Sequence, residues 1–158
     1  MANTQSMCTS FMGDLFNAVH NFGTAPTRAS SAADTFKAAL YLASATINAS
    51  TTAYSATGEV TGTNYTAGGV TVTNATAPSS TNSSSTAGVG FWTPSASITY
   101  TNVTLSTAFD AMLMYNSSQS NKAVAVFTFG SQTITAGNFT LTMPSNTTTT
   151  ALLRLSTT

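Results

Sequence analysis

The stretch from Ala108 to Phe129 reads AFDAMLMYNSSQSNKAVAVFTF and carries the clearest structural signal of the chain. Its first part, Ala108 to Tyr115, is almost wholly apolar and can bury both faces, as a central strand of a sheet does. Residues 116–121 (NSSQSN) are typical of a turn, and Ala123 to Phe129 returns as a second apolar strand. We therefore expect an antiparallel hairpin at the centre of the fold.

Strand patterns also occur on both sides of this hairpin. Thr35 to Ala43 places apolar residues on one face at a period of two, with a short Ala-rich helix as the alternative. Gly130 and the pair Ala136–Gly137 are expected to interrupt the chain between strands. The pattern predicts a mainly β protein, an antiparallel, jelly-roll-like β-sandwich of about seven to eight strands. The further strands are expected at Gly69 to Asn74, Ala96 to Leu105, Phe139 to Met143 and Leu152 to Leu155.

The N-terminal region has a helical period instead. Apolar residues between Phe11 and Phe22 recur on one stripe, which predicts a short helix. The small residues and Pro26 between Gly23 and Ala33 indicate a linker. The chain would thus consist of an arm, residues 1–33, and a β-sandwich body, residues 34–158. The stripe is too apolar to stand in water, so its residues form the candidate interface: Phe11, Leu15, Phe16, Val19 and Phe22.

Charge is scarce in this chain. Only eight of 158 residues are charged, the net charge is zero, and roughly a fifth of the residues are Thr. An average domain carries about 25% charged residues. Without a basic cluster we expect no nucleic-acid partner, and without a run of 18 apolar residues no membrane span. The start, MANTQSMCTS, does not resemble a secretory signal. This composition favours a structural or binding module.

Catalytic and metal-site patterns are not found. Cys8 and His20 are the only residues of their types, and the four acidic residues share no motif. We therefore expect no catalytic, cofactor-binding or metal site, and no enzyme activity. Five aromatic residues have two interpretations, a sugar-binding face or, more commonly, core and interface packing. These residues are Tyr54, Tyr65, Phe91, Trp92 and Tyr100.

The polar stretch Ala77 to Gly90, APSSTNSSSTAGVG, predicts a long surface loop. A loop of this length serves contact or remains a solvent-facing tip, and we favour the tip because Ser and Thr make weak anchors.

A series of blocks follows in one order along the sequence: Cys8 to Phe11, Leu15 to Phe22, Thr35 to Tyr41, Tyr54 to Val60, Gly62 to Gly69, Tyr115–Asn116, Asn121 to Val126, Phe129–Gly130 and Thr135 to Gly137. Together these blocks resemble a family of small virion proteins of tailed bacteriophages. The stretch from Asn74 to Gly90 departs from this resemblance, since it is longer and richer in Ser and Thr than expected.

The resemblance implies a structural protein of the virion and brings no catalytic residues with it. A capsid cement or decoration protein is the role expected from it, with the major capsid protein as partner and self-association as a homotrimer. Such a protein is made in the bacterial cytoplasm and ends on the capsid surface. A tail or head-fibre component with an adhesive role at the host surface is the alternative. The number of copies per virion distinguishes the two.

Overall fold

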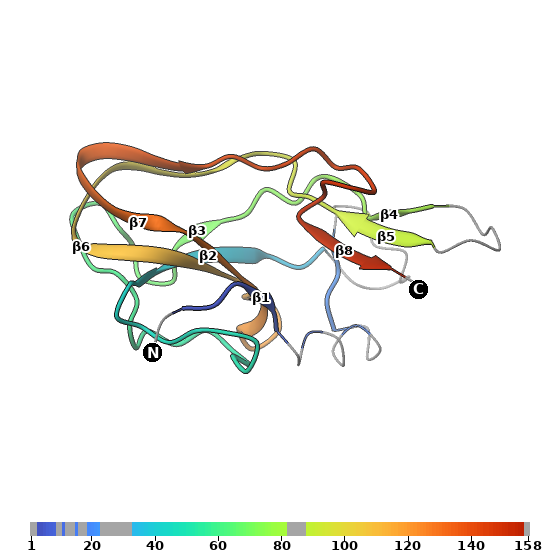
Figure 1. Cartoon of the computed structure of the whole chain (residues 1–158), viewed down its shortest axis with the longest axis horizontal. Coiled ribbons are helices and arrows are strands. Elements are labelled where there is room, and N and C mark those ends of the chain that lie inside the picture. Colours follow the sequence, from blue (N-terminus) through green and yellow to red (C-terminus); the bar gives the residue numbers. More distant parts are fainter. Residues whose placement is uncertain are drawn as a thin grey trace.

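A computed structural model describes residues 3–8, 11, 15, 19–22, 33–81 and 88–156 of the chain. This part is mainly β and forms two antiparallel sheets (Figure 1). The strands are β1 (Ser6–Met7), β2 (Phe36–Leu42), β3 (Val70–Thr71), β4 (Ser79–Ser80), β5 (Val89–Trp92), β6 (Ile98–Asn116), β7 (Lys122–Leu141) and β8 (Leu153–Ser156). One sheet has the order β1-β7-β6-β2-β3 and the other the order β4-β5-β8.

The predicted central hairpin is confirmed as the pair β6 and β7. The two strands pair from Asn116 opposite Lys122 outward, and residues 117–121 form the turn. Ser120 and Asn121 have positive φ angles of 51° and 58°, which a tight turn requires. Residues near the turn are buried on both faces, and β2 and β1 pair with the outer edges of β6 and β7 there.

The hairpin is longer than the sequence pattern indicates. β6 has 19 residues and β7 has 20, so Gly130 and Ala136–Gly137 do not end a strand. Instead the register shifts at several points, among them between Leu105 and Phe109 and between Phe109 and Ala111. Such irregularities let a long ladder bend without ending, whereas the sequence pattern had suggested separate strands.

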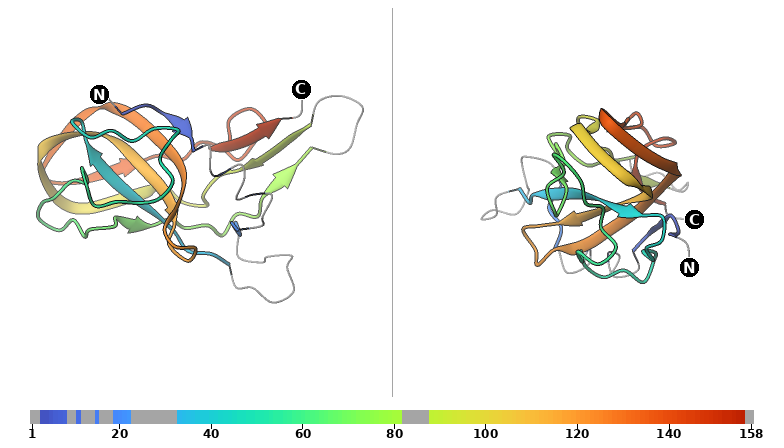
Figure 2. Two further views of the ribbon diagram at one scale, coloured as in Figure 1. Left: turned by 90° about the horizontal axis from the view of Figure 1, so that it is seen from below. Right: turned by 90° about the vertical axis from the view of Figure 1, so that its left-hand side faces the viewer.

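The bend brings the far half of the hairpin back over the sheet (Figures 1 and 2). Tyr100, in this far half, donates a hydrogen bond of 2.7 Å from its hydroxyl to the carbonyl of Ala38 in β2. Phe109 lies at the bend, is fully buried and contacts the rings of Phe129 and Phe139 edge-on, at 6.0 and 5.1 Å. The core therefore lies largely between two halves of one hairpin.

The neighbouring elements fit around this hairpin. The strand predicted over Thr35 to Ala43 is confirmed as β2, so the helical alternative is wrong. The predicted strand Gly69 to Asn74 is confirmed only as the short β3. Gly69 has a φ of +71°, and a side chain there would overlap the Ala38 carbonyl, so only glycine fits.

The surface loop predicted over Ala77 to Gly90 is wrong at its two ends. Ser79 and Ser80 form β4, and Val89 and Gly90 begin β5, so a β-ribbon occupies the ends of the expected loop. Residues 82–87 lie outside the described part of the chain.

The predicted N-terminal helix is not an element of the described structure. Phe11 and Leu15 have helical backbone, but Val19 to Phe22 do not, and residues 12–14 and 16–18 lie outside the described part. Side-chain packing replaces the expected helical stripe, since Phe11 is buried and Phe22 stacks on Phe36. The division into residues 1–33 and 34–158 stays a prediction. Ser6 and Met7 of the expected arm pair with β7 as an edge strand of the larger sheet.

Replacing Phe109 by Ala should lower the free energy of unfolding by about 3–5 kcal/mol, because the ring is fully buried at the bend. Phe127→Ala is the matched control, since Phe127 lies on β7 but is only half-buried, so its loss should cost clearly less. Urea denaturation of both variants measures the difference. Equal costs would contradict the placement of the core at the bend.

Candidate functional site

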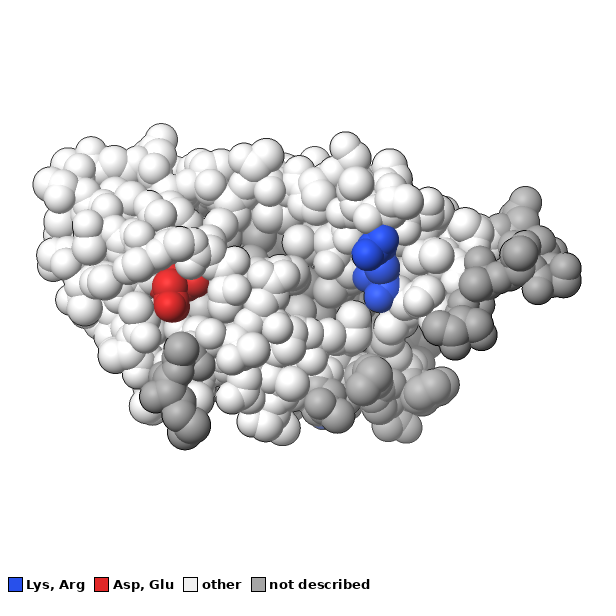
Figure 3. Space-filling view, viewed as in Figure 1, with Lys and Arg blue, Asp and Glu red and all other residues white. Residues whose placement is uncertain are grey.

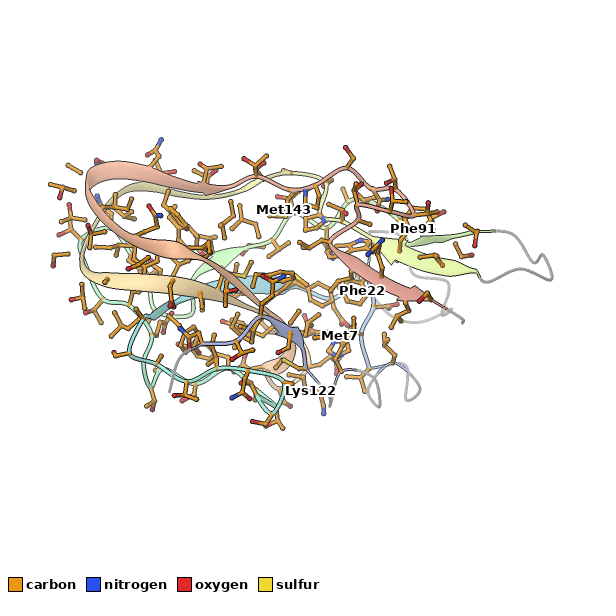
Figure 4. All side chains as sticks on the ribbon, in the orientation of Figure 1. Met7, Phe22, Phe91, Lys122 and Met143 are labelled. Atoms are coloured by element: carbon orange, nitrogen blue, oxygen red, sulfur yellow. The ribbon has the colours of Figure 1, made fainter. Side chains whose placement is uncertain are left out.

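An apolar groove of about 180 Å³ lies between the N-terminal segment and the three-stranded sheet. Figure 4 labels Met7, Phe22 and Phe91, which come from three separate segments and line this groove. All three strands of the three-stranded sheet contribute residues to the wall of the groove. The lining residues are Met7, Phe11, Leu15, Phe22, Pro78, Ser79, Gly90, Phe91, Trp92, Leu153, Arg154 and Leu155.

Three of the five predicted interface residues meet in this groove. Phe11 is 2% exposed and belongs to the protein's own core, whereas Leu15 and Phe22 are half-buried and line the opening. Val19 is half-buried but does not line the groove, and Phe16 lies outside the described residues. The predicted stripe is therefore divided between internal packing and an accessible apolar surface.

Aromatic rings fix the inner wall of the groove. Phe22 stacks on Phe36 with ring centroids 4.5 Å apart and planes 10° apart, and it contacts Trp92 at 4.7 Å. The Trp92 indole N–H donates to the carbonyl of Thr76 at 2.9 Å, which anchors the small sheet. Trp92 is 3% exposed, so core packing is the correct interpretation for this residue and a sugar-binding face is not.

A polar cluster at Asp34 fastens the N-terminal segment to the hairpin. The Asp34 Oδ2 atom accepts hydrogen bonds of 2.8 Å from the Asn21 amide and from Asn116 Nδ2, and Oδ1 accepts one of 3.2 Å from Gln119 Nε2. Both Asp34 and Asn116 are buried. A buried carboxylate is costly unless it is hydrogen-bonded, and here backbone and side-chain donors satisfy it.

His20 joins the same cluster as a neutral side chain. Asn116 Nδ2 donates to Asp34, which orients the amide and leaves its second hydrogen for His20 Nδ1 at 3.1 Å. The Nδ1 atom is therefore an acceptor, and the proton of the ring is on Nε2. This arrangement holds His20 against the Phe11 ring at 4.9 Å, which suits a structural role.

A second polar cluster surrounds Glu59 and was not predicted from the sequence. Glu59 Oε2 accepts from the Tyr54 hydroxyl at 2.6 Å, and Oε1 accepts from the Tyr65 hydroxyl at 2.7 Å and from the Gly68 amide at 2.8 Å. The Tyr65 hydroxyl in turn accepts from the Leu40 amide at 3.0 Å. This carboxylate ties the loops between β2 and β3 to β2. The short spacing of Tyr54, Glu59 and Tyr65 in the sequence was the one feature from which this cluster could have been predicted.

Neither cluster has the form of a catalytic centre. The three acidic residues that are described have separate partners: Asp34 binds Asn116, Glu59 binds tyrosines, and Asp110 accepts from Asn3 at 2.6 Å. Burial raises the pKa of the Cys8 thiol to about 11, so this thiol stays protonated near neutral pH. Within the described ranges no group of three or more His, Cys, Asp or Glu side chains is placed to hold a metal ion.

The molecular surface carries few charges. Asp34 and Glu59 are buried, and Figure 3 shows one basic and one acidic patch, well apart, on the face that it displays. The exposed Arg154 donates from Nη1 to the carbonyls of Thr148 and Thr149 at 3.2 and 2.7 Å. The far half of the β6–β7 hairpin exposes only uncharged residues, mainly Thr, Ser and Asn.

Comparison of the chain with protein-family models, with curated proteins and with solved structures found no match. The part of the chain that the structure describes contains no helix that is long and apolar enough to cross a membrane.

Alkaline pH should unfold the protein by ionising buried tyrosines. Burial is the main cause that raises the pKa of Tyr41 to about 12, and burial also raises the pKa of Tyr65 and Tyr100 above the usual value near 10. Unfolding then releases protons above about pH 10, so the contribution of these tyrosines to the free energy of unfolding is fully present below this pH and falls between about pH 10 and 12.

Tyrosinate absorbance and circular dichroism recorded over one alkaline titration check this expectation. Most of the tyrosinate signal should appear together with the loss of β structure. Reversible ionisation of all five tyrosines near pH 10 in the folded protein would show that the tyrosine hydroxyl groups are open to solvent, which would contradict this expectation.

Proposed function

We propose that this chain is a non-enzymatic structural protein of a tailed-bacteriophage virion, of the cement or decoration type. It binds the major capsid protein between capsomers at the capsid surface after synthesis in the bacterial cytoplasm. The observation that carries the proposal is that the described surface has few charges and combines an apolar groove with a hydroxyl-rich hairpin face. The family resemblance of the sequence supports the same role.

The proposed mechanism uses apolar burial and hydrogen bonds. An apolar side chain of the capsid protein enters the groove beside Leu15 and Phe22, while the Thr-rich face of the hairpin offers hydroxyl groups to neighbouring polar atoms. Burying one large apolar side chain contributes about 1.5–3 kcal/mol, which is too little for stable attachment alone. Self-association, proposed as a homotrimer, multiplies this contact by avidity.

The body of this protein is proposed to be a sandwich-like, jelly-roll-related unit made from the two sheets. A rigid β body suits a protein that fills a gap of fixed shape, since little ordering is needed on binding. A tail or head-fibre component with an adhesive role remains the second candidate, and the same groove and hydroxyl-rich face would serve it.

Leu15→Asp tests the groove, because a carboxylate at its rim opposes burial of an apolar partner. We expect binding to cement-free shells to weaken by about 10-fold or more, from the loss of one apolar contact. Ser50→Asp is the control, since it adds the same charge at an exposed turn outside the groove and should bind as the wild type does. Pelleting of shells with bound protein measures occupancy. Wild-type occupancy of a folded Leu15→Asp protein would refute the groove as the contact.

Attachment should also be nearly independent of salt, because the described surface has few charges to be screened. Raising the ionic strength from about 0.1 M to 1 M shortens the screening length from about 10 Å to 3 Å and leaves apolar burial intact. Binding isotherms on shells at both strengths should coincide within a factor of about two. A steep loss of affinity at high salt would instead indicate an electrostatic contact.

A further inference from the structure

Strand β8 is an edge strand of the three-stranded sheet, and the pairing pattern shows which of its backbone groups lack a partner strand. Thr81 donates its amide to the Val89 carbonyl at 3.0 Å, so the backbone of Val89 faces β4. Backbone groups alternate in direction along a strand, so Gly90 and Trp92 face β8. Their register partners are Leu155 and Leu153, which therefore face β5.

The same alternation turns the amide and carbonyl groups of Arg154 and Ser156 outward, along the free edge of β8. Between them lies Leu155, whose side chain is 46% exposed and is the single exposed large hydrophobic residue in the described part of the chain. Leu155 also lines the rim of the apolar groove. Within the described part of the chain, this edge thus offers backbone groups without a partner strand and an apolar side chain at one place.

The opposite edge of the same sheet is protected. In β4 the backbone of Ser79 faces Phe91 in β5, so Ser80 and the preceding Pro78 face outward. Pro78 has no N–H group, and β4 is only two residues long. Short strands and proline are features that prevent edge-to-edge pairing, and β8 has no proline.

We propose that β8 pairs antiparallel with β8 of a second copy of this chain. The pair is centred on Leu155, so that Arg154 lies opposite Ser156 of the partner subunit and the two Leu155 side chains meet at a two-fold axis. This position is a non-hydrogen-bonded pair, in which opposite side chains are closest. The two small sheets become one sheet of six strands.

The charges of the two subunits permit this contact. The register places Arg154 opposite a serine, and its guanidinium is already bound to the carbonyls of Thr148 and Thr149 in its own subunit. Each guanidinium group is therefore already hydrogen-bonded within its own subunit. An isologous contact of this kind closes after two copies. The inference stands independently of the virion proposal.

Sedimentation tests the pair. Four-residue strands bury less area than the roughly 1,200–2,000 Å² of stable complexes, so association should appear only at high concentration, towards about 1 mM. We expect the molecular mass measured at that concentration to be twice the mass measured at low concentration. Ser156→Pro removes an outward N–H and leaves the bonds to β5, so it should abolish this doubling while circular dichroism stays unchanged. Leu155→Lys places like charges at the axis and should do the same.

Cross-linking tests the register directly. Leu155→Cys should form an intermolecular disulfide at least about ten times faster than Ser80→Cys, an exposed position on the protected edge of the same sheet. Cys8 is fully buried and does not compete. A wild-type protein that shows no doubling up to the highest concentration would overturn the proposal. Equal cross-linking at both edges, or doubling that persists in Ser156→Pro, would also overturn it.

Discussion

The bent β6–β7 hairpin is the constraint on which the rest of the structure depends. Its half near the turn is buried on both faces, and its far half folds back so that Tyr100 reaches Ala38 in β2. The described strands β1 and β2 pair directly with this hairpin, and β3 joins the same sheet through β2. The register shifts around Phe109 make the bend possible, and the aromatic contacts of the buried Phe109 ring stabilise it.

Two of the charged residues that the structure describes, Asp34 and Glu59, are buried and hold segments of the molecule together. Asp34 fastens the N-terminal segment to the hairpin through Asn21 and Asn116, and Glu59 ties the loops between β2 and β3 to β2 through tyrosines. The described surface is rich in hydroxyl and amide groups and includes an apolar groove. Such a surface is poorly suited to attracting a charged substrate and well suited to close contact with another protein. The burial of Asp34 and Glu59 thus agrees with the proposed role as a binding protein.

The apolar patterns of the sequence predicted the central hairpin, β2 and β8, because buried strands leave a local signature. The bend was not predicted, because Gly130 and Ala136 were interpreted as breaks between strands. Both residues lie inside the single strand β7, whose pairing with β6 is irregular. The predicted helix over Phe11 to Phe22 was wrong, because the described structure contains no helix element there and Phe22 instead stacks on Phe36 and contacts Trp92. Three of the five interface residues do meet in the groove. The Glu59 cluster depends on contacts between loops, which periodicity does not reveal.

The central claim is that this protein is a structural component of a virion, and its copy number per particle tests that claim most directly. Quantitative mass spectrometry of purified particles of the proposed source phage gives the ratio to the major capsid protein. The account predicts hundreds of copies per particle, as expected for a protein bound between capsomers. A few dozen copies would assign it to a tail or fibre instead. Its absence from infectious particles would contradict the account.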